Sequence, residues 1–188
     1  MATGIDSEQT RAQLSKLSSR VGEIASDVHD VSYELHPSRL RAIGLVSALQ
    51  SLCRDTSVQR NVRVTFTQGV VPPAVDADVS LCLYRIAQES LHNVVRHSHA
   101  RDAQVAIDCD EGFVSLQIAD SGIGFDPRQV AHAGLGLHSM RERVAILNGQ
   151  LTIDAALGTG TQIMVRIPLG SPVEHAGSRE NGCSGLSS

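Results

Sequence analysis

The chain has 188 residues, which is enough for one full domain with a helical extension or a tail. Its net charge of −4 at pH 7 argues against a protein that binds nucleic acid or anionic lipid through an overall basic surface. An aromatic fraction of 3% within a hydrophobic fraction of 41% predicts an aliphatic core, and no apolar run approaches the ~20 residues that a membrane helix needs.

The first predicted element is a long helix over about residues 6 to 35, where Gly22 is the only glycine and proline is absent. Apolar residues recur there at alternating steps of three and four: Leu14, Leu17, Val21, Ile24, Val28, Val31 and Leu35. This heptad pattern favours a helix from a dimeric bundle, and the alternative is an amphipathic helix that packs on its own domain. Pro37 ends the helix because it has no amide donor.

A second helix is predicted over about 43–56, followed by a strand over 61–68 and a loop at the sequence VVPP. A long helix then covers 76–98, with Asp76 or Asp78 as its N-cap.

The second half of the chain is dominated by predicted hairpins. Strands over 102–110 and 112–120 are joined by a tight turn at Asp110 to Gly112. A glycine-bearing loop leads to a helix closed by Gly149, and a last hairpin covers 150–156 and 160–169. This order predicts an α+β fold, a two-layer α/β sandwich whose mixed, mostly antiparallel sheet carries helices on one face.

Three polar side chains share one face of the long helix. Glu89, Asn93 and His97 follow each other at steps of four, Arg96 lies beside them, and the same face is apolar one or two turns upstream. A carboxylate and an amide oxygen one turn apart suit a hydrated Mg²⁺, which prefers oxygen ligands. A solvated helix end is the alternative for this segment taken alone.

Asp120 ends a predicted strand, and Gly122 and Gly124 follow it at alternate positions. Two glycines this close permit a positive φ and let the backbone approach a flat ligand. The carboxylate beside them can accept a hydrogen bond from an exocyclic amine. The alternative interpretation is a glycine-rich loop that binds no ligand.

Two further glycine motifs follow. Gly134 and Gly136 lead directly into a helix, and the free amides of a helix N-terminus form an anion site. Gly158, Gly160 and Thr161 precede the last strand, where they also fit a simple hairpin turn.

Together, in this order, the four motifs resemble the ATP-binding domain of the GHKL superfamily, which covers histidine kinases, type II topoisomerase ATPase subunits, mismatch-repair MutL proteins and heat-shock chaperones. The finer resemblance is to histidine kinases of the nitrate-sensor type. It is carried by the segments YRIAQESLHNVVRHSHA, GLGLHSMRERVAILNGQL and VSYELHPSRLRAIGLVSAL.

The resemblance implies a Bergerat-type fold and three regions. Residues 1–36 would be the second helix of a dimerisation hairpin, residues 37–169 the ATP-binding catalytic domain, and residues 170–188 a disordered tail.

The same resemblance implies how adenine would be recognised. Asp120 would bind the adenine amine with help from Thr161, while Gly122 and Gly124 would leave room for the ring.

It also implies a phosphate and metal site. Asn93 would ligate Mg²⁺, Glu89 would orient a metal-bound water or act as a base, and Arg96 and His97 would lie near the phosphates. The β- and γ-phosphates would bind the backbone amides at the start of the helix, from Gly134, Leu135, Gly136 and Leu137.

His29, in the pair His29-Asp30, is a candidate for a phosphate-accepting histidine. In the heptad register it follows Val28 and faces solvent. Only six residues separate it from His36, so no hairpin fits between them and residues 6–36 match the second hairpin helix. We therefore interpret His29 as a surface residue.

The expected function is that of the catalytic part of a two-component sensor histidine kinase. It would use ATP and Mg²⁺ to phosphorylate a histidine absent from this chain, and its partners would be a response regulator and a second kinase copy bound through the N-terminal helix. Nucleic acid is not an expected partner, and a membrane would be reached only through regions outside this chain.

Two alternatives stay open, an anti-sigma-factor-type serine kinase and a nucleotide-binding module without turnover. The long heptad helix argues against the first, and intact Glu89 and Asn93 argue against the second.

The cellular location is inferred from what the sequence lacks. Its N-terminus has no signal-peptide segment, and its four cysteines are scattered without metal-ligand spacing: Cys53, Cys82, Cys109 and Cys183. We interpret them as reduced thiols of a cytoplasmic protein.

Overall fold

The computed structural model describes Leu40, residues 42–126 and residues 135–169. The chain divides into two compact units, residues 1–42 and residues 43–188. The expected N-terminal helix with His29, the expected tail over 170–188, and Gly134 lie outside the described residues.

The second unit alternates helices and strands along the chain. Its helices are α3 (Leu45–Arg60), α4 (Ala77–Asn93), the π-helical turn η1 (Val94–Ser98) and α6 (Leu135–Ile146). Its strands are β1 (Arg63–Gln68), β2 (Asp102–Asp110), β3 (Phe113–Asp120), β4 (Gln150–Ala156) and β5 (Gly160–Pro168).

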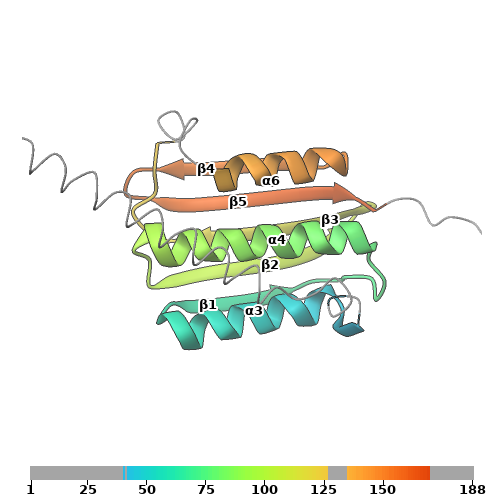
Figure 1. The fold of residues 1–188 in the computed structure, drawn as a ribbon, viewed down its shortest axis with the longest axis horizontal. Helices are drawn as coiled ribbons and strands as arrows, with labels where there is room; N and C mark the ends of the chain where they lie inside the picture. The colour runs from blue at the N-terminus through green and yellow to red at the C-terminus, as the bar shows by residue number, and fades with distance from the viewer. Residues whose placement is uncertain (1–39, 41, 127–134, 170–188) are drawn as a thin grey trace, which may run out of the picture. The chain divides into compact units, whose positions relative to one another are not determined.

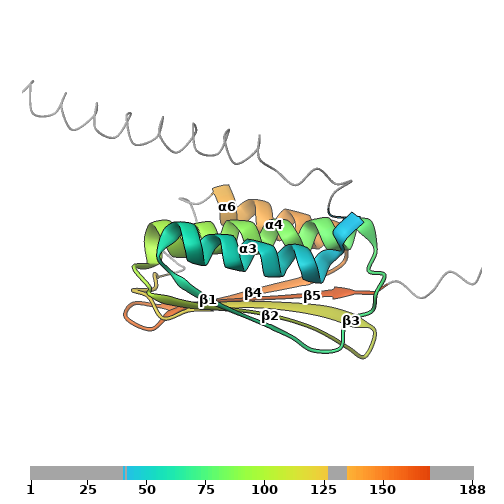
Figure 2. The ribbon, with the colours of Figure 1, turned by 90° about the horizontal axis from the view of Figure 1, so that it is seen from below.

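The five strands form one sheet in the order β1-β2-β3-β5-β4. β1 pairs with β2 in parallel, and the other three pairs are antiparallel. Helices α3, α4 and α6 lie side by side on one face of the sheet (Figures 1 and 2). The predicted fold class is therefore confirmed.

The core lies between the helices and the sheet. Alternate residues of the central strands are buried, as the period of two requires: Val105, Ile107, Val114, Leu116, Ile118, Ile163, Val165 and Ile167. They face an apolar stripe on α4 that includes Leu83, Ile86 and Leu91. Tyr84 is the one aromatic side chain among the buried apolar residues of the described segments, so the core is aliphatic as the composition predicts.

Local signals set the element ends. Asp76 is the N-cap of α4, because its Oδ1 accepts hydrogen bonds from the amides of Asp78 (2.8 Å) and Val79 (3.2 Å). The β2–β3 turn has Glu111 and Gly112 at φ 49° and 80°, which is the two-residue type I′ pattern.

The predicted closure of the last helix by Gly149 is wrong in its detail. α6 ends at Ile146, and Asn148 takes the left-handed φ of 53°. The Gly149 amide donates to the Val144 carbonyl at 3.0 Å, which completes a Schellman motif. Gly149 is needed for space, because a Cβ there would lie 2.8 Å from Ile167 Cγ1.

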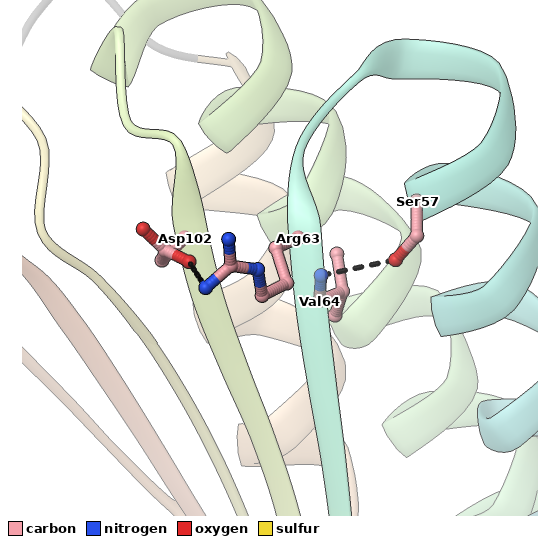
Figure 3. A network of polar contacts seen from close by, with 4 residues as sticks. All are labelled: Ser57, Arg63, Val64 and Asp102. Atoms are coloured by element: carbon pink, nitrogen blue, oxygen red, sulfur yellow. Dashed lines mark hydrogen bonds and ion pairs between the residues drawn. The ribbon is translucent and has the colours of Figure 1, made fainter.

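The helix α3 is joined to β1 through Ser57 (Figure 3). Its hydroxyl donates to the Cys53 carbonyl at 2.9 Å and accepts from the Val64 amide at 3.0 Å. Arg63 and Asp102 form an exposed ion pair across β1 and β2 at 3.3 Å, which contributes little to stability.

No helix of the described segments has both the length and the hydropathy of a membrane span.

Burial raises the pKa of the Cys53 thiol to about 12. The folded protein therefore keeps a proton that the unfolded chain loses above about pH 9. The contribution of this thiol to the free energy of unfolding is fully present below pH 9 and is lost as the pH rises toward 12. We expect the Cys53→Ala variant to lose stability less steeply across this range, as measured by urea unfolding at each pH. Equal slopes for parent and variant would contradict this assignment.

Candidate functional site

A cavity of about 410 Å³ is lined by α4 and η1, by the end of β3 and the start of β5, and by the start of α6. Eight of the predicted site residues line it: Glu89, Asn93, His97, Asp120, Gly124, Gly136, Leu137 and Thr161. Gly122 lies next to it and bonds to Asp120. Arg96 is not among the described residues that line it, so its predicted place near the phosphates has no support from this cavity.

The helix α4 brings the two predicted metal-site residues to the cavity. Leu83 and Leu91 of the same helix are buried, which anchors α4 in the core. Glu89 and Asn93 lie one turn apart, so both side chains reach the same cavity wall.

The predicted α-helix over 76–98 changes character after Asn93. The last five residues, Val94–Ser98, form a π-helical turn, a feature that is rare and frequent at functional sites. This turn keeps Val94, exposed His97 and buried Ser98 on the cavity.

Asp120 occupies the last position of the buried face of β3. It follows buried Ile118 by two residues, so both point to the helical layer, and in register it pairs with Thr161 of β5. The Gly122 amide donates to Asp120 Oδ1 at 2.8 Å. One carboxylate oxygen, Oδ1, is thereby held by the backbone, and Asp120 is among the residues that line the cavity.

The two glycine motifs at this edge meet. Gly124 has φ 59°, and a Cβ there would collide with the carbonyl of Ala156 and lie 2.7 Å from that of Gly160. The Gly158 amide donates to the Ile123 carbonyl at 2.7 Å. The loop after β3 and the β4–β5 turn therefore form one packed unit around Asp120.

These contacts predict different costs for two alanine substitutions. Gly158 has φ 81° with open space around it, so Gly158→Ala should cost about 1–2 kcal/mol of unfolding free energy from backbone strain alone. Gly124→Ala adds the collision and should cost about 2–5 kcal/mol. Urea unfolding of both variants checks this order, and equal losses would show that the packing around Gly124 is misjudged.

The carboxylate of Glu89 lies against the first turn of α6. A Cβ on Gly136 would collide with Glu89 Oε1 and lie 2.9 Å from its Cδ, so glycine leaves room for this carboxylate. The first turn of α6 contains no acidic residue, and the positive end of a helix favours negative charge.

The donor set fits a magnesium ion. Glu89 and Asn93 would offer it a carboxylate and an amide oxygen from one wall, and Mg²⁺ prefers oxygen ligands.

The apolar residues that line the cavity were not predicted from the sequence. They are Val94, Ile118, Ile123, Phe125 and Ile163, with the serines Ser90 and Ser98 beside them. A signal existed in the strands, because Ile118 and Ile163 are each two residues from a predicted polar ligand residue and so share its face. An apolar wall beside the Asp120 carboxylate suits a flat ring that carries an amine.

The chain falls into the class of ATPase domains built on an α+β sandwich. The family described as "Histidine kinase-, DNA gyrase B-, and HSP90-like ATPase" matches residues 78–171, which is half of the chain, and the chain belongs to this family.

Two curated relatives of this chain are sensor histidine kinases. Sensor histidine kinase ComP of Bacillus subtilis (strain 168) is 30% identical over 164 residues, which cover 86% of this chain and 21% of ComP. Oxygen sensor histidine kinase NreB of Staphylococcus carnosus (strain TM300) is 28% identical over 170 residues, 86% of this chain and 48% of NreB. The resemblance to sensor histidine kinases is confirmed, and the chain spans half or less of these relatives.

Solved structures support the fold. The blue-light activated histidine kinase of Erythrobacter litoralis EL346 superposes with a TM-score of 0.59 at 20% identity, over 84% of this chain and 50% of that one. Acinetobacter baumannii histidine kinase AdeS superposes with a TM-score of 0.56 at 15% identity, over 91% and 88%.

Proposed function

We propose that this chain is the catalytic part of a two-component sensor histidine kinase. It binds Mg-ATP and passes the γ-phosphoryl group to a histidine on a helix outside residues 1–188, and from there to a response regulator. The observation that carries the proposal is that one cavity joins the Glu89–Asn93 wall to Asp120 and Thr161, in a chain similar to ComP and NreB over 86% of its length.

Adenine binds at the strand end in this proposal. Asp120 accepts a hydrogen bond from the 6-amino group through the oxygen that Gly122 does not hold, and Thr161 lies beside it. Ile118 and Ile163 pack against the ring, which makes the site apolar around one polar contact.

The triphosphate extends from there toward α4 and α6. Asn93 ligates Mg²⁺ through its amide oxygen, and Glu89 orders a metal-bound water or takes a proton. The amides of Gly136 and Leu137, at the positive end of α6, bind phosphate oxygens. Bound Mg²⁺ neutralises charge on the phosphates.

The reaction is an in-line displacement at the γ-phosphorus. A histidine nitrogen forms the new N–P bond, the bond to the β-phosphate oxygen breaks, and ADP leaves with that electron pair. The part played by this chain is to position the reactants and to hold the charges, which supplies most of the acceleration for phosphoryl transfer.

The regions around this site complete the proposal. Residues 1–36 form the second helix of a dimerisation hairpin that pairs two kinase copies, residues 37–169 are the catalytic domain, and residues 170–188 are a tail. The catalytic part works in the cytoplasm.

The type of phosphoprotein tests the function. We expect the full-length protein, which in this proposal carries the acceptor helix as well as residues 1–188, to give protein-bound label from γ-labelled ATP and Mg²⁺ that survives base and is lost in acid, as phosphohistidine is. Acid-stable label would identify a serine kinase of the anti-sigma-factor type and contradict the proposal. Nucleotide binding without label would identify a binding module.

A further inference from the structure

We propose that Ser98 is a positioning residue that sets the orientation of Asp120 and thereby sharpens the selectivity for adenine. This inference rests on the proposed function. Ser98 ends the π-helical turn η1, lines the cavity and is 7% exposed. It carries no charge and lies within the segment YRIAQESLHNVVRHSHA, in which only Glu89, Asn93, Arg96 and His97 have a predicted role.

Two polar groups of Ser98, its hydroxyl and its carbonyl, make three hydrogen bonds. Its hydroxyl donates to the Val94 carbonyl at 2.8 Å and accepts from the Ala100 amide at 3.0 Å. Its carbonyl accepts from the Ile123 amide at 2.8 Å. The two hydroxyl bonds fix the end of the π turn on both sides, where His99 takes a left-handed φ of 55°. They therefore determine where the Ser98 carbonyl points.

Ser98 also packs against the loop that carries the base-recognition carboxylate. A Cβ on Gly122 would lie 2.6 Å from Ser98 Cβ, and closer still to the Ser98 carbonyl. The same Cβ would lie 2.7 Å from Asp120 Oδ1, which accepts from the Gly122 amide at 2.8 Å. Gly122 is thus held between Ser98 and Asp120.

These contacts form one continuous connection from the metal-site helix to the base-recognition carboxylate. η1 continues directly from α4, which carries Glu89 and Asn93, and Ser98 joins η1 to the residues that orient Asp120. If the hydroxyl bonds are lost, the Ser98 carbonyl and Gly122 can shift, and Asp120 Oδ2 no longer keeps a fixed place for the 6-amino group. A ligand without that amine loses less.

The test compares ADP with inosine diphosphate, which carries an oxygen at position 6, by calorimetric titration in MgCl₂. We expect Ser98→Ala to weaken ADP binding roughly 3- to 10-fold, the effect of one or two hydrogen bonds, and inosine diphosphate binding less than twofold. The ratio of the two dissociation constants should therefore move toward one. Ser98→Thr keeps the hydroxyl and should restore most of the ratio.

Ser57 offers a matched control because its hydroxyl makes the same kinds of bond, to a carbonyl four residues earlier and from an amide beyond the helix (Figure 3). It joins α3 to β1, away from the cavity. Ser57→Ala should lower the melting temperature as much as Ser98→Ala does, within a few degrees, and leave the ADP preference unchanged.

Several results would overturn the inference. An unchanged ratio in Ser98→Ala, whether both affinities fall together or neither falls, would leave Ser98 a purely structural residue. A Ser98→Thr ratio as low as that of Ser98→Ala would show that the hydroxyl is not the cause. Failure of the proposed function looks different, because the parent protein would then show no preference for ADP and Asp120→Asn would change nothing.

Discussion

The Asp120→Asn variant should bind ADP roughly 10- to 150-fold more weakly than the parent, because a hydrogen bond to a charged group is worth about 1.5–3 kcal/mol. The Gly122 amide, which now donates to Asp120 Oδ1, will keep an oxygen of the new side chain facing it. The amide nitrogen of asparagine must then face the 6-amino group of adenine, and two donors meet. Isothermal titration in MgCl₂ measures the effect.

The control for this substitution is Asp110→Asn. Asp110 ends β2 as Asp120 ends β3, it is exposed, and it pairs with Phe113 at the opposite end of β3. The same loss of charge there should change the ADP affinity by less than twofold. If Asp120→Asn binds as well as Asp110→Asn, Asp120 does not recognise the base.

The Asn93→Ala variant should lose the magnesium-dependent part of nucleotide binding. With Mg²⁺ present we expect an affinity for ADP roughly 10- to 100-fold lower than in the parent, the range seen when groups around a metal are removed. In EDTA the two proteins should bind alike, because the amide then has no ion to ligate. Titrations with and without Mg²⁺ separate the two contributions.

Asn93→Asp tests the chemistry of the ligand. A carboxylate keeps an oxygen in the same place on α4, so this variant should recover a large part of the binding in Mg²⁺. A loss in Asn93→Ala that is equally large in EDTA would mean that Asn93 supports the cavity rather than the ion.

Much of this fold could be predicted because local signals agree with the tertiary structure. The strands of the second half alternate buried and exposed residues, and the Glu111-Gly112 turn fixes the register of β2 with β3. Asp76 was one of two candidate N-caps, and only the hydrogen bonds of its Oδ1 distinguish it from Asp78.

Other features depend on contacts between distant parts of the chain. The parallel pairing of β1 with β2 follows from the crossover through α4, which no pattern within Arg63–Gln68 encodes. The π turn over Val94–Ser98 has no distinct signal in its sequence, and its last residue bonds to Ile123 in the loop after β3. Both lie beyond what periodicity can reveal.

The candidate site also combines residues that the sequence predicts with residues that only the fold brings together. Polar residues such as Glu89, Asn93 and Asp120 were identified because motifs of charged residues and glycine are visible in the sequence, and the cavity brings them together. Phe125 and Ile123 have no such signal, since an apolar residue in a loop becomes part of a binding wall only through its neighbours in space. Arg96 lies beside this helix face in the sequence, its role near the phosphates was implied by the resemblance, and it is not among the described residues that line the cavity.

The most direct measurement is a crystal structure of the protein with a non-hydrolysable ATP analogue and Mg²⁺. The account predicts the adenine amine within hydrogen-bonding distance of Asp120 Oδ2, the ion on the oxygen of Asn93, and the phosphates beside Gly136. A nucleotide bound anywhere other than in the cavity between α4, β3 and α6 would contradict it.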